Sequence, residues 1–312
     1  MMIPTYNGER YLADALNSVL AQDPGPAAMQ VEVVDDRSTR GDPEAIVRRA
    51  GERVTFFRQP SNVGHAANFN TCLRRARGTV VHLLHDDDWA RDGFYRRLEP
   101  PLRDNPEVGA AFSRYLYADG EGHWRTLSRL ERRTPGVVED WLPKIASGQR
   151  LTTPSVVVRR SVYELLGGFD ERITVGGEDW EMWVRIATRF PVWFEPEPLA
   201  VYRVNRPGSL TGNAASSAAL ARDMLLATDI VAAYLPTYLT AGRADTALRR
   251  ARAEYSRWAV EAAHRHLLRG QRRAAFNAAR LALSGGPKPQ VMEAMLETLA
   301  RSAVHRLRSR RH

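Results

Sequence analysis

The chain of 312 residues contains one cysteine, Cys72, and therefore cannot close an internal disulfide. A single thiol is typical of proteins that work in a reducing compartment. Cys72 lies in a stretch whose apolar residues have helical spacing, and no second thiol is near it. We therefore expect Cys72 to pack in the core rather than to take part in chemistry.

Long apolar runs are also absent. A membrane-spanning helix needs about 18 or more consecutive apolar residues, and the most apolar stretch, residues 214–235, is interrupted by Arg222, Asp223 and Asp229. The first residues, Met-Met-Ile-Pro-Thr-Tyr-Asn, have neither the basic leader nor the apolar run of a secretory signal. These absences predict a cytoplasmic protein, at most peripheral on the inner face of the membrane.

Several nucleotide-binding signatures are missing as well. No G-x-G-x-x-G follows a strand pattern, which argues against a dinucleotide oxidoreductase. No zinc-ligand spacing, RNP-type aromatic pair or heptad is present, so nucleic acid is not an expected partner. A nucleotidyltransferase of related fold stays open as an alternative, although the segment Pro4–Gly8 lacks the Gly-rich, Arg- or Lys-bearing loop that such an enzyme has after its first strand.

Positive charge is concentrated toward the C-terminus. The formal net charge is +9, and residues 241–312 contain sixteen Lys and Arg against five Asp and Glu. Such a region can attract anionic lipid headgroups, nucleic acid or acidic polysaccharide, or can simply be a solvated helix surface. Its interleaved apolar residues favour an anionic membrane surface as a partner. The alternative to an enzyme is a non-catalytic basic protein that binds membrane or nucleic acid.

The chain is 44% hydrophobic and 26% charged, as is usual for globular proteins. Short apolar runs alternate with helical patterns over the first two hundred residues, which predicts an α/β fold with a parallel sheet. Strands are expected over 31–34, 54–58, 79–84, 108–117 and 156–159, and helices over 11–20, 43–50, 66–76, 94–103, 161–166 and 178–190.

Beyond Asn205-Arg206-Pro207-Gly208 the pattern becomes almost wholly helical and rich in alanine and arginine. We therefore predict a catalytic domain over residues 1–208 and a basic helical region over 209–312. Only Met1-Met2-Ile3 precede Pro4, so we expect the first strand to be very short or the natural chain to begin upstream. Residues 118–150 are polar and partly irregular, and such segments are often functional loops.

Acidic residues stand where two predicted strands end. Asp35-Asp36 follow one strand, and Asp86-Asp87-Asp88 follow another. Ligands of open α/β sheets bind at the carboxyl ends of strands, and adjacent carboxylates repel one another unless they are solvated or neutralised. Mg²⁺ or Mn²⁺, which prefer carboxylate oxygens and substrate phosphates, would neutralise them. The alternative is an exposed acidic turn.

A second acidic pair, Glu178-Asp179, opens a predicted amphipathic helix after Gly176-Gly177. A carboxylate here could act as the base that deprotonates an acceptor hydroxyl. Equally, acidic residues are common in a first helical turn because the helix dipole favours them.

Together these segments resemble glycosyltransferase family 2, whose members have the GT-A fold. The resemblance covers about residues 1–205. It rests on the segments Ile3-Pro4-Thr5-Tyr6-Asn7, Val33-Val34-Asp35-Asp36-Arg37-Ser38-Thr39, Asn62-Val63-Gly64 with Asn68, His85-Asp86-Asp87-Asp88-Trp89, Gly167-Gly168-Phe169-Asp170, Glu178-Asp179-Trp180 and Glu197-Pro198-Leu199-Ala200-Val201-Tyr202-Arg203. It implies a Rossmann-like, mostly parallel sheet flanked by helices.

The resemblance also implies roles in binding a nucleotide sugar. Pro4, Thr5 and Tyr6 would line the nucleotide site, with Tyr6 stacked on the base. Asp36 would hydrogen-bond the base or ribose, with Asp35 beside it. Independently of the family, the turn that begins at Asn62 lies between a strand and a helix, so its N–H groups could face phosphate, or it could be an ordinary turn.

The resemblance further implies the catalytic machinery. Asp88 would be the principal ligand of a divalent metal, Asp87 would contact the ribose and the metal's water shell, as Asp86 could, and Asp179 with Glu178 would supply the general base. Many members have Asp-x-Asp-Asp where this chain has His85 followed by three aspartates. His85 is thus either a ligand or a neighbour of the site.

The expected function is metal-assisted transfer of a sugar, with inversion, from a nucleoside-diphosphate sugar to an acceptor hydroxyl in surface glycan or polysaccharide biosynthesis. The acceptor could be a glycan, a lipid-linked glycan or a small molecule, and residues 113–160 are expected to contact it. Trp180 could stack on an acceptor sugar, whereas Trp183 is expected in the core. Arg203 and Arg206 could meet the diphosphate or lie on the surface.

Overall fold

A computed structural model of the chain describes residues 1–204 and 218–284, so Arg206 and the remaining residues lie outside the described part. The chain divides into two compact units. The first comprises residues 1–145, 149–174 and 178–206, and the second comprises 146–148, 175–177 and 207–312. The predicted mixed α/β class is confirmed, whereas the domain limits at residue 208 stay a prediction.

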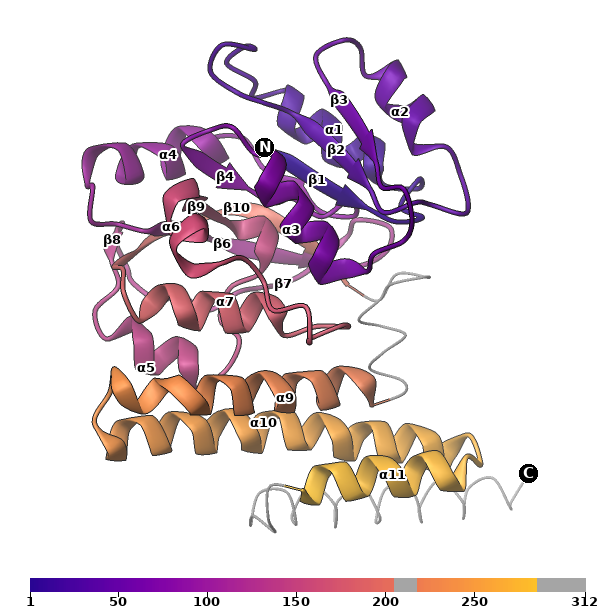
Figure 1. Ribbon diagram of the computed structural model, residues 1–312, viewed down its shortest axis with the longest axis vertical. Helices are drawn as coiled ribbons and strands as arrows, with labels where there is room; N and C mark the ends of the chain where they lie inside the picture. Colours follow the sequence, from indigo (N-terminus) through magenta and orange to yellow (C-terminus); the bar gives the residue numbers. More distant parts are fainter. Residues whose placement is uncertain (205–217, 285–312) are drawn as a thin grey trace. The chain divides into compact units, whose positions relative to one another are not determined.

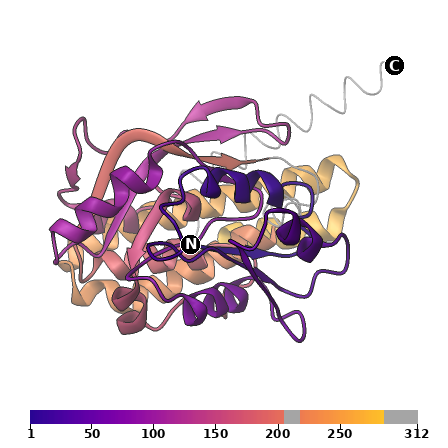
Figure 2. The same cartoon turned by 90° about the horizontal axis from the view of Figure 1, so that it is seen from above.

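The first unit begins with a small parallel sheet in the order β1-β2-β3 (Figure 1). Its strands and helices alternate along the chain: β1 (Met2–Thr5), α1 (Leu12–Leu20), β2 (Glu32–Asp35), α2 (Pro43–Arg49), β3 (Thr55–Arg58) and α3 (His65–Arg75). Helices α1 and α3 lie on opposite faces of this sheet (Figures 1 and 2). Strand β1 has four residues, and all four are buried.

The apolar periodicity of the sequence explains how these helices pack. Leu12 and Leu16 of α1 are buried in one core cluster with Ile3 and Val33 of the strands. Cys72 is fully buried in α3, as predicted for a packing residue. Helix α1 begins at Leu12, and the Asn7 side chain before it accepts hydrogen bonds from backbone N–H groups of the β2–α2 loop.

A larger sheet of mixed direction completes the first unit, with the order β4-β9-β6-β10-β5, β7 paired to β6 and β8 paired to β10. Its strands are β4 (Val80–His82), β5 (Trp89–Ala90), β6 (Ala110–Ala118), β7 (Trp124–Leu127), β8 (Gly136–Val137), β9 (Val156–Arg159) and β10 (Val192–Arg203). Because β9 is antiparallel to β4 and β6, the expected mostly parallel arrangement describes the small sheet better than the large one.

The helices of this part are α4 (Phe94–Asp104), α5 (Trp141–Ala146), α6 (Arg160–Leu166) and α7 (Glu178–Ala187), with a 3-10 turn, η1 (Thr153–Ser155), before β9. A parallel bridge between Met2 and Leu83 joins the two sheets, and the N–H of Leu84 donates to the carbonyl of Met2 at 3.0 Å. The residues that follow β4 therefore run beside β1, close to its carboxyl end.

Strand β10 was not predicted as a strand. Its register against β6 shifts between Glu195 and Pro198 and again before Ala200. Prolines have no N–H for a ladder hydrogen bond, and they also break the alternation by which strands are recognised in a sequence. The strand nonetheless brings Arg203 to the three aspartates that follow β4, Asp86-Asp87-Asp88, which we call the acidic run.

Within the second unit, residues 218–284 are largely helical, as predicted for the C-terminal region. It contains α9 (Ala219–Tyr234), a 3-10 turn η2 (Leu235–Thr237), α10 (Ala241–Leu268) and α11 (Arg272–Leu283). Small side chains such as Ala221, Ala259 and Ala282 are buried where these helices pack together. None of the helices in the described ranges combines the length and the apolar character needed to cross a bilayer.

Candidate active site

The acidic run after β4 and the end of β1 are held together by a direct side-chain contact. The hydroxyl of Thr5 donates to Oδ2 of Asp86, which is almost fully buried. Gly8 makes this approach possible, because a Cβ atom at this position would lie 1.8 Å from the same carboxylate oxygen. The need for glycine at position 8 is thus steric.

Asp88 is the most deeply buried acid of the run, with 1% of its surface exposed. Its Oδ1 accepts a hydrogen bond of 2.7 Å from the backbone N–H of Arg203. Its Oδ2 receives no hydrogen bond in the described structure, although Nδ1 of His85 lies 3.2 Å away. Burial, and next the negative charge of Asp87, raise the pKa of Asp88 to about 7. Asp88 thus has one oxygen held by a backbone N–H and a second oxygen that faces the imidazole of His85.

His85 faces the same acidic group. Burial alone would lower the pKa of its imidazole, but Asp88 first and then Asp87 and Asp179 outweigh burial and raise the pKa of His85 to about 9. His85 therefore interacts directly with the aspartates of the acidic run.

A divalent cation fits this arrangement. His85, Asp87 and Asp88 can each offer one donor atom, and these atoms lie within 4.8 Å of one another. Neighbouring ligands in an octahedral shell with bonds of about 2.1 Å are about 3 Å apart, close to the separation of Nδ1 and Oδ2. The buried Oδ2 of Asp88 without a hydrogen-bond donor is the observation that favours a cation here.

The second acidic strand end, at β2, has a different environment. Asp36 accepts hydrogen bonds from the backbone N–H groups of Val63 and Gly64, at 2.7 and 2.9 Å, and from the Asn62 amide at 3.0 Å. Burial raises the pKa of Asp36 despite these donors. Its carboxylate thus holds the turn that leads into α3, and Asn62 is an exposed part of that turn.

Asp35, which the resemblance places beside Asp36 in the nucleotide site, is turned into the interior. Its side chain has no exposed surface, accepts hydrogen bonds from Ser38, and forms an ion pair of 2.7 Å with Arg58. Pro4 and Thr5 are also buried, whereas 47% of Tyr6 is exposed. Of the residues at the end of β1, Tyr6 is therefore the one with a face available for stacking.

Asp179, at the start of α7, is held in a defined orientation. Its Oδ2 accepts hydrogen bonds from the Gln149 amide at 2.9 Å and the Thr153 hydroxyl at 3.4 Å, and its Oδ1 accepts one from the N–H of Trp180. Burial, with a further contribution from the charge of Glu178, raises the pKa of Asp179 to about 6. The residue keeps a small exposed surface, and its carboxylate is more basic than that of an ordinary aspartate.

Glu178 pairs with a histidine that the sequence did not single out. Nε2 of His65 lies 2.8 Å from its Oε1, while its Oε2 is buried without a hydrogen bond in the described structure. Burial would raise the pKa of Glu178, but His65 outweighs it and the net pKa is lowered. The His65 and His85 rings are 6.2 Å apart, with Phe69 against both, so this pair lies beside the acidic run. The position of His65 at a helix start was visible in the sequence, but its partner was not.

Trp180 does not offer a surface to a sugar, which corrects the acceptor role considered for it. The side chain is fully buried, and its indole N–H donates to the carbonyl of Ile145 at 2.8 Å. Trp183 is also buried, as predicted. Both rings thus hold α7 in the core, and neither faces the acceptor.

Arg203 was expected either to meet a diphosphate or to lie on the surface, and its side chain is instead buried. It lies between two aromatic rings, 4.0 Å from the centroid of Tyr11 and 4.9 Å from that of Trp89. It also donates to the carbonyl of Gly120 at 3.2 Å. The side chain anchors the end of β10, and only the backbone N–H reaches Asp88.

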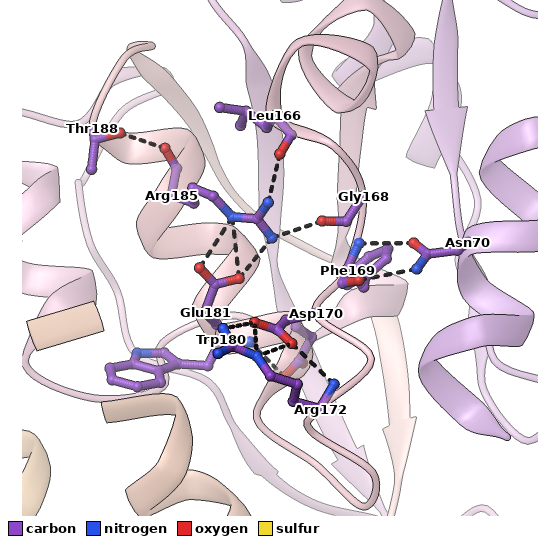
Figure 3. Close-up of polar contacts among 11 residues, drawn as sticks. Asn70, Leu166, Gly168, Phe169, Asp170, Arg172, Trp180, Glu181, Arg185 and Thr188 are labelled. Carbon is purple, nitrogen blue, oxygen red and sulfur yellow. Dashed lines mark hydrogen bonds and ion pairs between the residues drawn. The ribbon is translucent and has the colours of Figure 1, made fainter. Parts of the chain in front are cut away.

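The loop before α7 is clamped by Asn70 of α3 (Figure 3). The Asn70 amide donates to the carbonyl of Phe169 at 3.0 Å and accepts from the N–H of Phe169 at 2.8 Å. Gly168 has a φ of +80°, and a Cβ atom there would lie 2.5 Å from Oδ1 of Asn70. The glycine thus permits both the backbone turn and the close contact.

Arg185 fixes the other side of this loop. Its guanidinium pairs with Glu181 at 2.7 Å and donates to the carbonyls of Leu166 and Gly168, each at 2.7 Å (Figure 3). Asn70 and Arg185 together bind the Gly167–Asp170 segment to α3 and α7. We infer that they set the position from which α7 presents Asp179.

Comparison with known sequences places the first part of the chain. The sequence model described as Glycosyl transferase family 2 matches residues 1–166. An uncharacterized protein of Mycobacterium tuberculosis is 31% identical over 215 residues, which is 64% of this chain and 65% of that protein. The O-antigen biosynthesis protein RfbC of Myxococcus xanthus is 27% identical over 203 residues, 60% of this chain and 16% of that protein. Each match spans less than two thirds of the relative's length.

Solved structures show the same fold at low sequence identity. TarS residues 1–349 from S. aureus, in complex with UDP-GlcNAc, has a TM-score of 0.60 and 17% identity, over 96% of this chain and 79% of that one. The mannosyltransferase PcManGT from Pyrobaculum calidifontis, in complex with GDP-Man and Mn²⁺, has a TM-score of 0.58 and 22% identity, over 97% and 79%. The α/β fold with a helical C-terminal region is therefore that of the GT-A glycosyltransferases.

The clamp leads to a prediction for Asn70→Ala. The change removes two hydrogen bonds to Phe169, so the loop should loosen and Asp179 should lose its position. We expect the turnover rate to fall about ten- to a hundredfold and the free energy of unfolding to fall by about 1–3 kcal/mol. Steady-state kinetics and urea unfolding measure the two effects. Asn17→Ala, on the exposed face of α1, is the control, and an unchanged turnover rate in Asn70→Ala would contradict the positioning role.

Proposed function

Because the chain belongs to glycosyltransferase family 2, we propose that it transfers a sugar from a nucleoside diphosphate to an acceptor hydroxyl, with inversion at the anomeric carbon and with the help of a divalent cation. The observation that carries this proposal is the arrangement around Asp179. A carboxylate with a raised pKa is held by Gln149 and Thr153 in the same site as His85 and the acidic run.

The nucleotide would bind at the carboxyl ends of β1 and β2. Tyr6 has an exposed ring that can stack on a base, and the Asn62 turn, held by Asp36, presents polar groups next to it. Asp86, fixed by Thr5 and closely approached by Gly8, would contact the ribose. The donors in the two solved structures, UDP-GlcNAc and GDP-Man, are both sugar nucleotides.

Asp88 and Asp87 would hold Mg²⁺ or Mn²⁺, with His85 as the third donor. When bound, the cation neutralises negative charge on the departing nucleoside diphosphate. The residues of the chain contribute the geometry. The N–H of Arg203 fixes one oxygen of Asp88 and so aims the other oxygen toward His85.

Asp179 would accept the proton of the acceptor hydroxyl. A base is most effective when its pKa lies near the working pH while it is still ionised, and the raised pKa of about 6 meets both conditions near neutral pH. The oxygen would attack the anomeric carbon from the side opposite the diphosphate, which inverts its configuration. Glu178, paired with His65, would hold negative charge beside the base without taking the proton.

The acceptor is proposed to belong to surface polysaccharide biosynthesis, and the support is the similarity to RfbC of Myxococcus xanthus, which is described as an O-antigen biosynthesis protein. A glycan, a lipid-linked glycan or a small molecule would each present a hydroxyl. Peripheral binding of the basic C-terminal helices to an anionic membrane is part of this proposal. Its support is the charge of residues 241–312, which contain sixteen Lys and Arg.

The role of Asp179 predicts the behaviour of Asp179→Asn. The neutral amide keeps the size of the side chain but cannot accept the proton, so the turnover rate should fall by roughly 10²–10⁴-fold. Binding of the sugar nucleotide should change little. A coupled assay of nucleoside diphosphate release and calorimetric titration of the donor measure these effects. Turnover that survives the substitution would rule out Asp179 as the base.

The raised pKa of Asp179 also predicts a pH profile. Below about 6 the carboxylate is protonated, so turnover should fall about tenfold for each pH unit below that value and level off above it. The folded protein holds this proton more tightly than the unfolded chain, so the contribution of Asp179 to the free energy of unfolding should decrease as the pH rises from about 4 to about 6. The difference between wild type and Asp179→Asn isolates both effects, and a turnover profile without a limb near pH 6 would contradict them.

The proposed ligands predict metal selectivity. Asp88→Asn and Asp87→Asn should each weaken Mn²⁺ binding at least tenfold, as measured by calorimetry in the presence of a nucleoside diphosphate. An imidazole donor favours Mn²⁺ over Mg²⁺ more than a carboxylate does, so His85→Asp should shift the preference toward Mg²⁺. The Arg97→Gln variant, at an exposed position of α4, is the control. Unchanged selectivity in His85→Asp would show that His85 is not a ligand.

A further inference from the structure

The β6–β7 hairpin and the loop after it expose large apolar side chains. The exposed fractions are 62% for Trp124, 45% for Leu127 and 51% for Leu130. In the described structure β7 pairs only with β6, so its outer edge is open, and the hairpin lies at the margin of the view in Figure 2. Large exposed apolar residues gathered on one short segment mark an interaction surface.

A bulge in β7 explains why two of these side chains share a face. Without it, Trp124 and Leu127 would point to opposite faces, since side chains alternate along a strand. The register shifts at Arg125, so that Trp124 pairs with Ala118 and Leu127 pairs with Leu116. Ala118 and Leu116 are two residues apart on β6 and lie on one face, and Trp124 and Leu127 therefore lie on that face too.

This face continues a hydrophobic cluster of the first unit. Leu116 and Ala118 are buried with Val201, and Trp89 packs against them. Trp124 and Leu127 extend the same face outward into solvent. The exposed side chains are thus the outer part of an apolar surface with a rigid base.

In the β6–β7 hairpin and the loop after it, the acidic side chains pair with some of the arginines and leave others without an acidic partner in the described part of the chain. Asp119 pairs with Arg125, and Glu131 pairs with Arg150 at 2.9 Å. Arg129 and Arg133 are exposed and have no ion pair among the residues that the structure describes.

Two further arginines adjoin the hairpin. Glu121 in its turn pairs with Arg10 at 2.8 Å. The guanidinium of Arg91 lies 5.2 Å from the centre of the Trp124 ring. The hairpin therefore combines a tryptophan, two leucines and an excess of positive charge.

We propose that this surface, comprising Trp124, Leu127, Leu130, Arg129 and Arg133, docks on an anionic lipid bilayer. Tryptophan favours the interface between headgroups and hydrocarbon, leucine gains by entering the acyl region, and arginine is attracted to anionic headgroups. A protein partner would need acidic side chains placed opposite Arg129 and Arg133. An anionic bilayer instead presents negatively charged headgroups over its whole surface.

The position of the surface connects it to the site. Arg203 donates to Gly120 in the hairpin turn and packs on Trp89, and its backbone N–H holds Asp88. Docking would hold the acidic run close to the bilayer, where a lipid-linked acceptor would present its sugar. The proposal goes beyond the transfer reaction, and the binding of vesicles can be measured without any turnover.

A single-cysteine label tests the contact directly. The natural Cys72 is fully buried, so Leu127→Cys in the full chain can be labelled with an environment-sensitive fluorophore. We expect its emission to shift to the blue on addition of vesicles of phosphatidylglycerol and phosphatidylcholine, but not of phosphatidylcholine alone. Glu52→Cys, exposed before β3, is the control and should not shift. A Leu127 label that stays in water while the protein sediments with the vesicles would overturn the proposal and leave binding to the C-terminal helices.

A set of variants measures the energetics. Trp124→Ala with Leu130→Ser should weaken vesicle partitioning at least tenfold, and Arg129→Ser with Arg133→Ser should weaken it roughly fivefold for each arginine removed. Thermal unfolding of each variant shows that it is folded. Arg48→Ser with Arg49→Ser, on the exposed side of α2, is the matched control for charge. Partitioning that is absent in the wild type, or equal in all variants, would overturn the proposal.

Discussion

The burial of negative charge at the carboxyl ends of the strands is the constraint on which the rest of this site depends. Asp36, Asp86, Asp88 and Glu178 are all nearly inaccessible, and a buried carboxylate is unfavourable unless donors or cations surround it. Asp36 accepts hydrogen bonds from the N–H groups of a turn, and Asp86 accepts one from the Thr5 hydroxyl. Glu178 pairs with His65. Asp88 has a matched oxygen and an unmatched one. The unmatched oxygen of Asp88 lies beside His85, where a cation fits, and Oε2 of Glu178 is likewise buried without a hydrogen bond in the described structure.

The support of these acids comes from distant parts of the chain. The backbone of Arg203 reaches Asp88 only because β10 runs parallel to β6 as far as its last residue. Gln149 reaches Asp179 from the irregular segment before β9. Each contact joins residues many positions apart, so the geometry of the acids is a property of the whole first unit. A loop that became mobile at any of these places would therefore change the positions of the carboxylates.

The sequence predicted the acids well because their signal is local. A short apolar run followed by acidic residues identifies a strand end; Asp35 follows such a run directly, and Asp86 follows one after His85. The same reasoning could not separate Asp35, which is paired with Arg58 in the interior, from Asp36, one residue later. Which side of a strand end faces the ligand depends on the partner strand, and a single sequence does not contain that pairing.

The other incorrect predictions from the sequence also concern contacts between residues that are distant in the chain or the direction in which a side chain points. Trp180 looked accessible because it follows the base, but a helix turns each successive side chain by about 100°, and this turn points the ring into the core. Strand β10 was missed because Pro198 and its neighbours interrupt the alternation, and the role of Arg203 was missed with it. His65 and Glu178 are 113 positions apart, so nothing in the spacing of either motif indicated that they meet.

The bulge at Arg125 shifts the pairing of β7 with β6 by one residue, and this shift creates the exposed apolar surface of the hairpin. A regular β7 would place Trp124 and Leu127 on opposite faces, and neither face would then be strongly apolar. The extra residue turns both outward onto the face that begins with Leu116 and Ala118. An exposed edge strand with apolar side chains is a liability for aggregation, and two arginines next to it reduce that liability while keeping an attraction for anionic surfaces. The same arrangement that protects the edge therefore also selects the kind of surface on which it can bind.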